Sequence, residues 1–248
     1  MALPIIFITT AACGGSESPA DLDVPAEPAG RTIDPTTVGN IVGTITLEGM
    51  PPEPENIRMN SDPVCADEAS NTETEYYIVG DNGGLGNVFV YVKAGLEGLN
   101  FPAPTTAVTL NQDGCRYQPH VFGIRVDQTL EILNSDPTLH NIHATPASNQ
   151  EFNMGQPIEG MRFERTFSTP EVMVPFKCDV HGWMNAYAGV LDHPYFAVTG
   201  PDGSFEISGL PPGEYIVEAW HEMLGTAESN TSVAESATAE LAFTFETN

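Results

Sequence analysis

A short segment in the second half of the chain carries a sulfur or nitrogen donor at every third position: Cys178, His181 and Met184. A fourth donor, His140, lies upstream in the run 140–143, which reads His-Asn-Ile-His. One loop can aim three side chains at a single point only if the chain enters and leaves it in fixed directions, as it does between paired strands. We therefore expect a β-structure in which the first histidine arrives on a neighbouring strand.

The sequence around these donors reads as strands. Residues 123–134 alternate apolar and polar side chains, with a turn at Asp127-Gln128, and end shortly before His140. Residues 171–177 and 186–191 have the composition of strands that enter and leave the cysteine loop. The chain contains 23 Gly and 21 Pro and no long stretch of helical period, which predicts an all-β fold of short strands joined by turns.

Two imidazoles, a thiolate and a thioether favour a soft transition metal. A trigonal set of two histidines and one cysteine with a weak axial methionine holds copper in a geometry acceptable to both Cu(I) and Cu(II). Zinc is the main competitor, because it binds His and Cys readily, but Met is a poor zinc ligand. Taken singly, each residue has a structural alternative, as a buried cysteine or a core histidine. The four types at this spacing favour one mononuclear copper site.

The run at 140–143 and the loop Cys-Asp-Val-His-Gly-Trp-Met together resemble the cupredoxins, the small blue copper proteins with a Greek-key β-sandwich. The loop length is most similar to that of amicyanin. The resemblance covers residues 106–194 and implies a type 1 copper site with the ligands His140, Cys178, His181 and Met184.

The same resemblance assigns roles to residues beside the ligands. Asn141 would bridge the two ligand loops by hydrogen bonds, and His143 would lie close by without binding the metal. The loop also contains Asp179 and Gly182 and lacks proline. A carboxylate beside the thiolate should favour Cu(II), which argues for a lower reduction potential.

Residues 195–248 resemble the second part of a carboxypeptidase regulatory-like, transthyretin-like β-sandwich. The signature is an Asp-Gly-x-Phe hairpin followed by a Leu-Pro-Pro-Gly-x-Tyr strand, both with turn residues of fixed backbone preference. We expect the first part in residues 39–105, with strands at 39–47 and 87–93, so that the copper sandwich is inserted in it or fused to it. A single enlarged sandwich with shared strands is the competing architecture.

The remaining cysteines indicate an oxidising compartment. If Cys178 binds metal, Cys65 and Cys115 are left as a disulfide pair. Closing this loop of about fifty residues would stabilise the fold by about 4 kcal/mol in the chain-entropy model, and the bond requires an extracytoplasmic location. Two free buried thiols are the alternative.

The start of the chain resembles a bacterial lipoprotein signal. Residues 1–12 are apolar, too short to cross a bilayer, and end in small side chains before Cys13. Residues 1–13 would then be a signal with Cys13 as the lipidated residue, and residues 14–38 a flexible tether. This predicts a protein of the bacterial periplasm or outer envelope whose membrane contact is a lipid anchor. An ordinary secretory signal is the alternative.

The charge balance excludes two classes of partner. The chain has 8 Lys and Arg against 34 Asp and Glu, a formal net charge of -26, so nucleic acid and anionic membrane surfaces would repel it. The acidity is explained either by steering of a basic redox partner or by a solvated acidic surface. Because no Ser-His-Asp order, phosphate-binding glycine loop or paired-carboxylate motif is present, we do not expect an enzyme.

The sequence therefore predicts an extracytoplasmic blue copper protein that carries one electron between Cu(I) and Cu(II). Electrons would pass to a redox partner of the cell envelope through an exposed edge of His181, with Trp183 in the docking patch. Copper binding and delivery is one alternative function, and a non-catalytic binding module with a structural metal is another. His120, His193 and His221 are expected outside the ligand set, with His120 near the rim of the site.

Overall fold

The computed structural model describes residues 32–69 and 71–247. These residues form strands β1 to β16 and one short helix, α1, which confirms the predicted all-β class. Within these residues, no helix is long and apolar enough to cross a membrane. The predicted signal, Cys13 and the tether as far as residue 31 lie outside the described residues.

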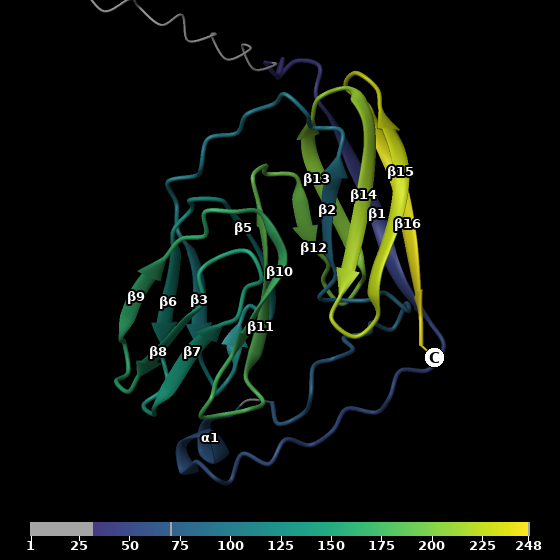
Figure 1. Ribbon diagram of the computed structural model, residues 1–248. Helices are drawn as coiled ribbons and strands as arrows, with labels where there is room; N and C mark the ends of the chain where they lie inside the picture. The colour runs from purple at the N-terminus through teal and green to yellow at the C-terminus, as the bar shows by residue number, and fades with distance from the viewer. Residues whose placement is uncertain (1–31, 70, 248) are drawn as a thin grey trace, which may run out of the picture. The chain divides into compact units, whose positions relative to one another are not determined.

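One β-sandwich comes from the middle of the sequence, and we call it the middle sandwich (Figure 1). A five-stranded sheet of order β5-β11-β10-β7-β8 packs against a four-stranded sheet of order β4-β3-β6-β9. Their shared core contains fully buried side chains such as Ile132, Ile142 and Phe176. The strands are β3 Val108–Gln112, β4 Tyr117–Gln118, β5 Val121–Arg125, β6 Leu130–Asn134, β7 His140–Ala144, β8 Phe152–Gln156, β9 Arg162–Arg165, β10 Glu171–Lys177 and β11 Asn185–Leu191.

The other sandwich is built from both ends of the described sequence, and we call it the outer sandwich. Its sheets have the orders β13-β1-β16 and β12-β2-β14-β15. The first strand, β1, pairs in parallel with the last, β16. The chain thus leaves this sandwich after β2 and returns to it with β12. The strands are β1 Gly39–Glu48, β2 Phe89–Ala94, β12 Phe196–Val198, β13 Ser204–Leu210, β14 Gly213–His221, β15 Gly225–Val233 and β16 Thr238–Glu246.

The strands predicted around the donor residues are confirmed. The segment 171–177 is β10, and β11 begins one residue before the predicted 186–191. The segment 123–134 contains β5 and β6, separated by a turn in which Asp127 has a φ of 60°. These two strands do not pair with each other, because β5 joins β11 in one sheet and β6 joins β3 in the other.

Two glycines allow aromatic rings of the outer sandwich to pack on the middle one. Gly123 in β5 and Gly189 in β11 are register partners. The rings of Phe89 and Phe196 stack with centroids 5.5 Å apart, and a Cβ atom at Gly189 or Gly123 would lie 2.2 Å or 2.1 Å from one of them. Only a strand surface without side chains leaves room for this contact.

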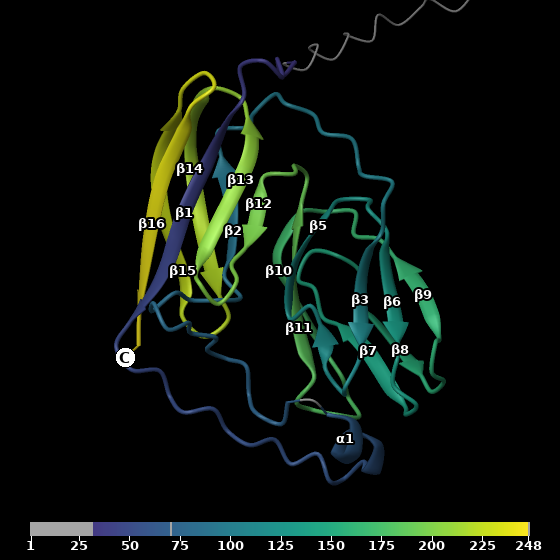
Figure 2. The same cartoon turned by 180° about the vertical axis from the view of Figure 1, so that it is seen from behind.

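Part of the segment between β1 and β2 packs on the middle sandwich, although residues 39–105 were assigned to the outer one. We call residues 57–69 and 71–75 the cap segment; it contains α1, Pro63–Glu68. Met59 and Cys65 lie in the core of the middle sandwich, and Cys65 forms a disulfide with Cys115. Both views place α1 at the end of the middle sandwich where β10 runs into β11 (Figure 2).

The glycine contact predicts a difference between two substitutions. Gly189→Ala would press a methyl group into the buried Phe89 ring, so we expect a loss of about 1–3 kcal/mol in the free energy of unfolding. Gly155→Ala in β8 meets nothing within 4 Å and should change stability by no more than about 0.5 kcal/mol. Denaturant unfolding measures both. Equal effects would show that the ring contact does not constrain Gly189.

Candidate metal centre

The loop between β10 and β11 holds three of the four predicted ligands in a closed turn. The two strands pair up to Lys177 and Asn185. Inside the loop the Cys178 amide donates to the Met184 carbonyl at 3.1 Å, and the Met184 amide donates to the His181 carbonyl at 2.9 Å. These bonds fix the backbone from which the side chains project.

The fourth predicted ligand arrives from the adjacent strand. His140 opens β7, which pairs with β10. One ligand atom each from His140, Cys178 and His181 lies within 4.8 Å of the others, and all three residues are buried. Met184 is fully buried in the core of the same sandwich. The structure therefore brings the two imidazoles and the thiol together.

The ring nitrogens of the two histidines are oriented by carboxylates. His140 Nε2 lies 2.8 Å from Asp136 Oδ2, and His181 Nε2 lies 3.1 Å from Asp62 Oδ2. Each Nε2–H donates to its carboxylate, so in a neutral imidazole the lone pair is on Nδ1. The two Nδ1 atoms are 2.9 Å apart, so facing lone pairs would repel, and either a proton on one ring or a metal ion bound to both relieves this repulsion. The donor set thus fits a metal ion.

The electrostatics of Cys178 favour the form that binds metals. Burial opposes ionisation of its thiol, but the His140 and His181 rings, which can donate to the sulfur when protonated, and hydrogen bonds from the backbone of Asn141 and His181 outweigh burial and lower the pKa to about 6. The thiolate is the metal-binding species. A metal ion at this centre would therefore meet an anionic sulfur near neutral pH.

Asn141 links the two ligand-bearing segments. Its side-chain oxygen accepts hydrogen bonds from the Asp179 amide at 2.7 Å and the Val180 amide at 3.3 Å. His143 lies outside the cluster, with its ring between Asp179 at 3.0 Å and Glu151 at 2.7 Å. The Asp179 carboxylate is thus engaged with His143 beside the loop.

The expected exposed edge of His181 is absent from the structure, which corrects that prediction. The residue is only 2% exposed, because the cap segment lies over its ring. Asp62 occupies Nε2, and the Cys65 sulfur is 3.8 Å from the same nitrogen. On another side the Trp183 ring is 5.0 Å away between centroids, and its Nε1 donates to the Cys115 carbonyl at 3.1 Å.

Sequence reasoning missed the two carboxylates. Asp136 lies four residues before His140, but a short spacing alone does not distinguish it from a solvated acid. Asp62 is 119 positions from His181. The one available signal was the pairing of Cys65 with Cys115, which brings the chain around residue 62 to the middle sandwich.

The other histidines lie apart from the centre. His120 is held by Glu222 at 2.5 Å and by the Asn185 carbonyl at 3.1 Å. Burial lowers the pKa values of His193 and His221 to about 4, so both are neutral core residues.

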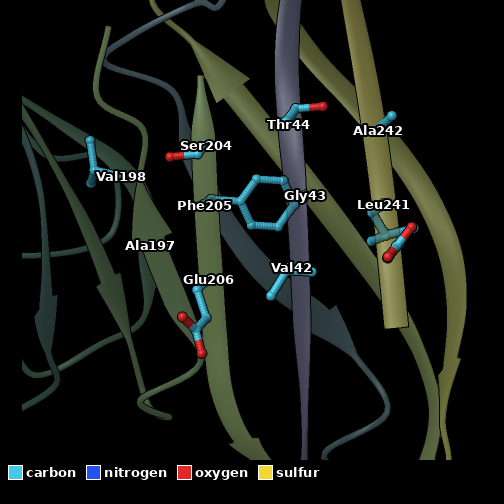
Figure 3. A pocket seen from close by; sticks show the side chains of 11 residues that line it. Val42, Gly43, Thr44, Ala197, Val198, Ser204, Phe205, Glu206, Leu241 and Ala242 are labelled. Carbon is cyan, nitrogen blue, oxygen red and sulfur yellow. The ribbon is translucent and has the colours of Figure 1, made fainter. Parts of the chain in front are cut away.

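A separate pocket lies in the outer sandwich, where the Phe205 ring covers Gly43 (Figure 3). It is lined by acids such as Glu206 and by apolar side chains.

Comparisons with known proteins give partial structural likenesses. No protein family model and no curated protein matches the chain. A copper-containing nitrite reductase from Thermus scotoductus matches at 21% identity and a TM-score of 0.32, over 42% of this chain but only 26% of the reductase. A mutant of amicyanin in the Cu(I) form matches at 17% identity and a TM-score of 0.30, over 34% of this chain and 81% of the amicyanin chain. A purple cupredoxin from Nitrosopumilus maritimus matches at 22% identity and a TM-score of 0.29, over 34% of this chain and 98% of the cupredoxin.

The lowered pKa of Cys178 can be measured without metal. In the metal-free protein, we expect thiolate absorbance in the ultraviolet to appear with a midpoint near pH 6 instead of the ordinary 9.0. His140→Ala removes one of the rings that stabilise the thiolate and should move the midpoint upward. Cys178→Ser supplies the baseline, because Cys178 is the free cysteine of the described residues. A midpoint near 9 in the unaltered protein would contradict the geometry.

Proposed function

We propose that this protein is a blue copper electron carrier in which His140, Cys178, His181 and Met184 hold one copper ion. The observation that carries the proposal is the convergence of two Nδ1 atoms and the Cys178 sulfur in a buried cluster. The resemblance of the ligand loops to cupredoxins points the same way. The bound copper would supply a one-electron couple between Cu(I) and Cu(II).

The protein's own contribution is to fix the donors before the metal arrives. The loop backbone is closed by its own hydrogen bonds, Asn141 ties it to β7, and the carboxylates fix the histidine tautomers. A rigid set of this kind suits both oxidation states and leaves little to rearrange on electron transfer. It also keeps water from the metal, since the donor residues are at most 2% exposed.

This burial argues against copper delivery, the main alternative. Transfer of an ion to an acceptor protein proceeds by ligand exchange, which requires an approachable site. Here the cap segment covers His181, and the remaining ligands are buried in the sandwich. A closed site of this kind retains its metal and passes only electrons.

With His181 covered, Trp183 is the best route for electrons to the surface. Its ring is inclined by 33° to that of His181 at 5.0 Å, and it is itself only partly buried. It lines a small cavity together with Tyr76, which is 39% exposed. A redox partner would dock here transiently through a small interface. The net charge of -26 favours a basic partner, and the disulfide favours an extracytoplasmic carrier.

Reconstitution tests occupancy directly. We expect the protein loaded with one equivalent of Cu(II) to turn intensely blue or green through charge transfer from the Cys178 thiolate, and Cys178→Ser to abolish the colour. Met184→Leu should keep the colour and raise the potential, because a weak axial donor tunes the site. His140→Ala should weaken copper binding far more than its matched control His143→Ala. A colourless protein that prefers zinc in competition would refute the proposal.

Electron exchange tests the route. Trp183→Ala should slow oxidation of the Cu(I) protein by a cationic cobalt(III) complex severalfold, while the spectrum and copper affinity stay nearly unchanged. Trp183→Phe keeps a ring beside His181 and should retain most of the rate. Trp220→Ala, at the chain's other tryptophan, is the control and should have no effect. Copper content is followed alongside oxidation state in envelope extract, and stoichiometric loss of copper to an acceptor would favour delivery instead.

A further inference from the structure

Asp62 reaches the metal centre from outside the sandwich that carries the ligands. It lies in the cap segment, immediately before α1. Its Oδ2 accepts hydrogen bonds from His181 Nε2 at 3.1 Å and from the Thr138 hydroxyl at 2.7 Å. Its Oδ1 accepts from the Val64 amide at 2.9 Å as the N-cap of the helix. Both oxygens are therefore engaged, and the carboxylate has one orientation.

The surrounding chain holds this carboxylate in place. The disulfide between Cys65 and Cys115 ties α1 to the middle sandwich three residues after Asp62. The Arg116 side chain, next to Cys115, donates to the Asn71 and Glu73 carbonyls and pairs with Glu75 at 3.8 Å. These contacts anchor the cap segment within the helix and after it. Asp62 is thus a built part of the site.

We propose that Asp62 is a positioning residue of the metal centre, which holds the His181 ring through its outer nitrogen and favours Cu(II) by its negative charge. The inference rests on the proposed copper site and deepens it. His181 sits on a loop, and rotation of its ring would move Nδ1 away from Cys178. A hydrogen bond from the outer nitrogen to a fixed carboxylate prevents this rotation and makes the ring a stronger donor.

The second histidine shows why Asp62 is needed. His140 lies at the start of a strand, and its own carboxylate, Asp136, comes from the same sandwich and is fixed by the amides of Gly114 and Cys115 at 2.8 Å and 2.9 Å. Within the described residues, no carboxylate of the β10–β11 loop contacts the His181 ring. The cap segment supplies the missing carboxylate from a distant part of the sequence, which gives both rings the same hydrogen-bond geometry.

Two variants separate the position of the carboxylate from its charge. Asp62→Ser keeps a good N-cap for α1 but is too short to reach His181. We expect copper release to a chelator to accelerate by about 10- to 100-fold, the usual effect of losing such an outer partner, and the reduction potential to rise. Asp62→Asn removes the charge and keeps a single acceptor oxygen. Turned toward His181 Nε2, this oxygen leaves the Val64 amide without its cap, so the potential should rise and release should accelerate less than in Asp62→Ser, at some cost to the stability of α1.

Asp67→Asn is the matched control, because it removes the same charge from an exposed position of α1 and should leave both quantities unchanged. A readout without metal completes the test: nuclear magnetic resonance of the metal-free protein should show a slowly exchanging Nε2–H on His181 that Asp62→Ser abolishes.

The outcomes distinguish this inference from the proposed function. If the unaltered protein binds copper with the expected colour but Asp62→Ser releases it at the original rate and potential, Asp62 is only a helix cap and the inference is wrong. If Asp67→Asn shifts the potential as much as Asp62→Asn, the charge acts at long range and the positioning role is wrong. If the unaltered protein forms no coloured copper site, the proposed function itself fails, while the resonance of the His181 ring still reports on the Asp62 contact.

Discussion

Two hydrogen bonds between histidine rings and carboxylates determine what the centre of this molecule can bind. Asp136 and Asp62 each take the outer nitrogen of one ring, which leaves both inner nitrogens as electron-pair donors 2.9 Å apart. Two facing lone pairs beside an acidic thiol favour a positive charge between them, either a ring proton or a metal ion. The same bonds fix the rings against rotation, so the surrounding strands act mainly to deliver these groups to one point.

The cap segment explains how a small sandwich gains this second carboxylate. A loop between neighbouring strands can place only its own side chains at the proposed metal site, whereas the chain between β1 and β2 is long enough to leave its own sandwich and return. Along the way it adds Met59 and Cys65 to the core of the middle sandwich. The cap segment therefore does three things at once. It covers His181, orients the His181 ring through Asp62, and is itself anchored by the disulfide.

The ligand loop and its strands could be predicted because they depend on local pattern. Cys178, His181 and Met184 lie on one turn, and the apolar, β-branched composition of 171–177 favours a strand. The position of Asp62 could not be predicted, because it depends on which surface the cap segment contacts, and the many acids of this chain do not differ in local sequence pattern. His181 is buried by a segment whose Asp62 lies 119 positions away in the sequence. The local hydrophobic pattern does not predict a contact between residues so far apart.

The parallel pairing of β1 with β16 has a consequence for how the chain assembles. Residues 40–48 are bonded in register to residues 238–246, so the first strand to be made acquires this neighbour only when the last one has emerged. Contacts so distant in sequence form late, because closing the long intervening loop costs entropy before any bond is gained. The cap segment, both cysteines of the disulfide and every proposed ligand precede residue 192. During synthesis the proposed metal pocket can thus form on a chain whose strands β1 and β16 have not yet paired.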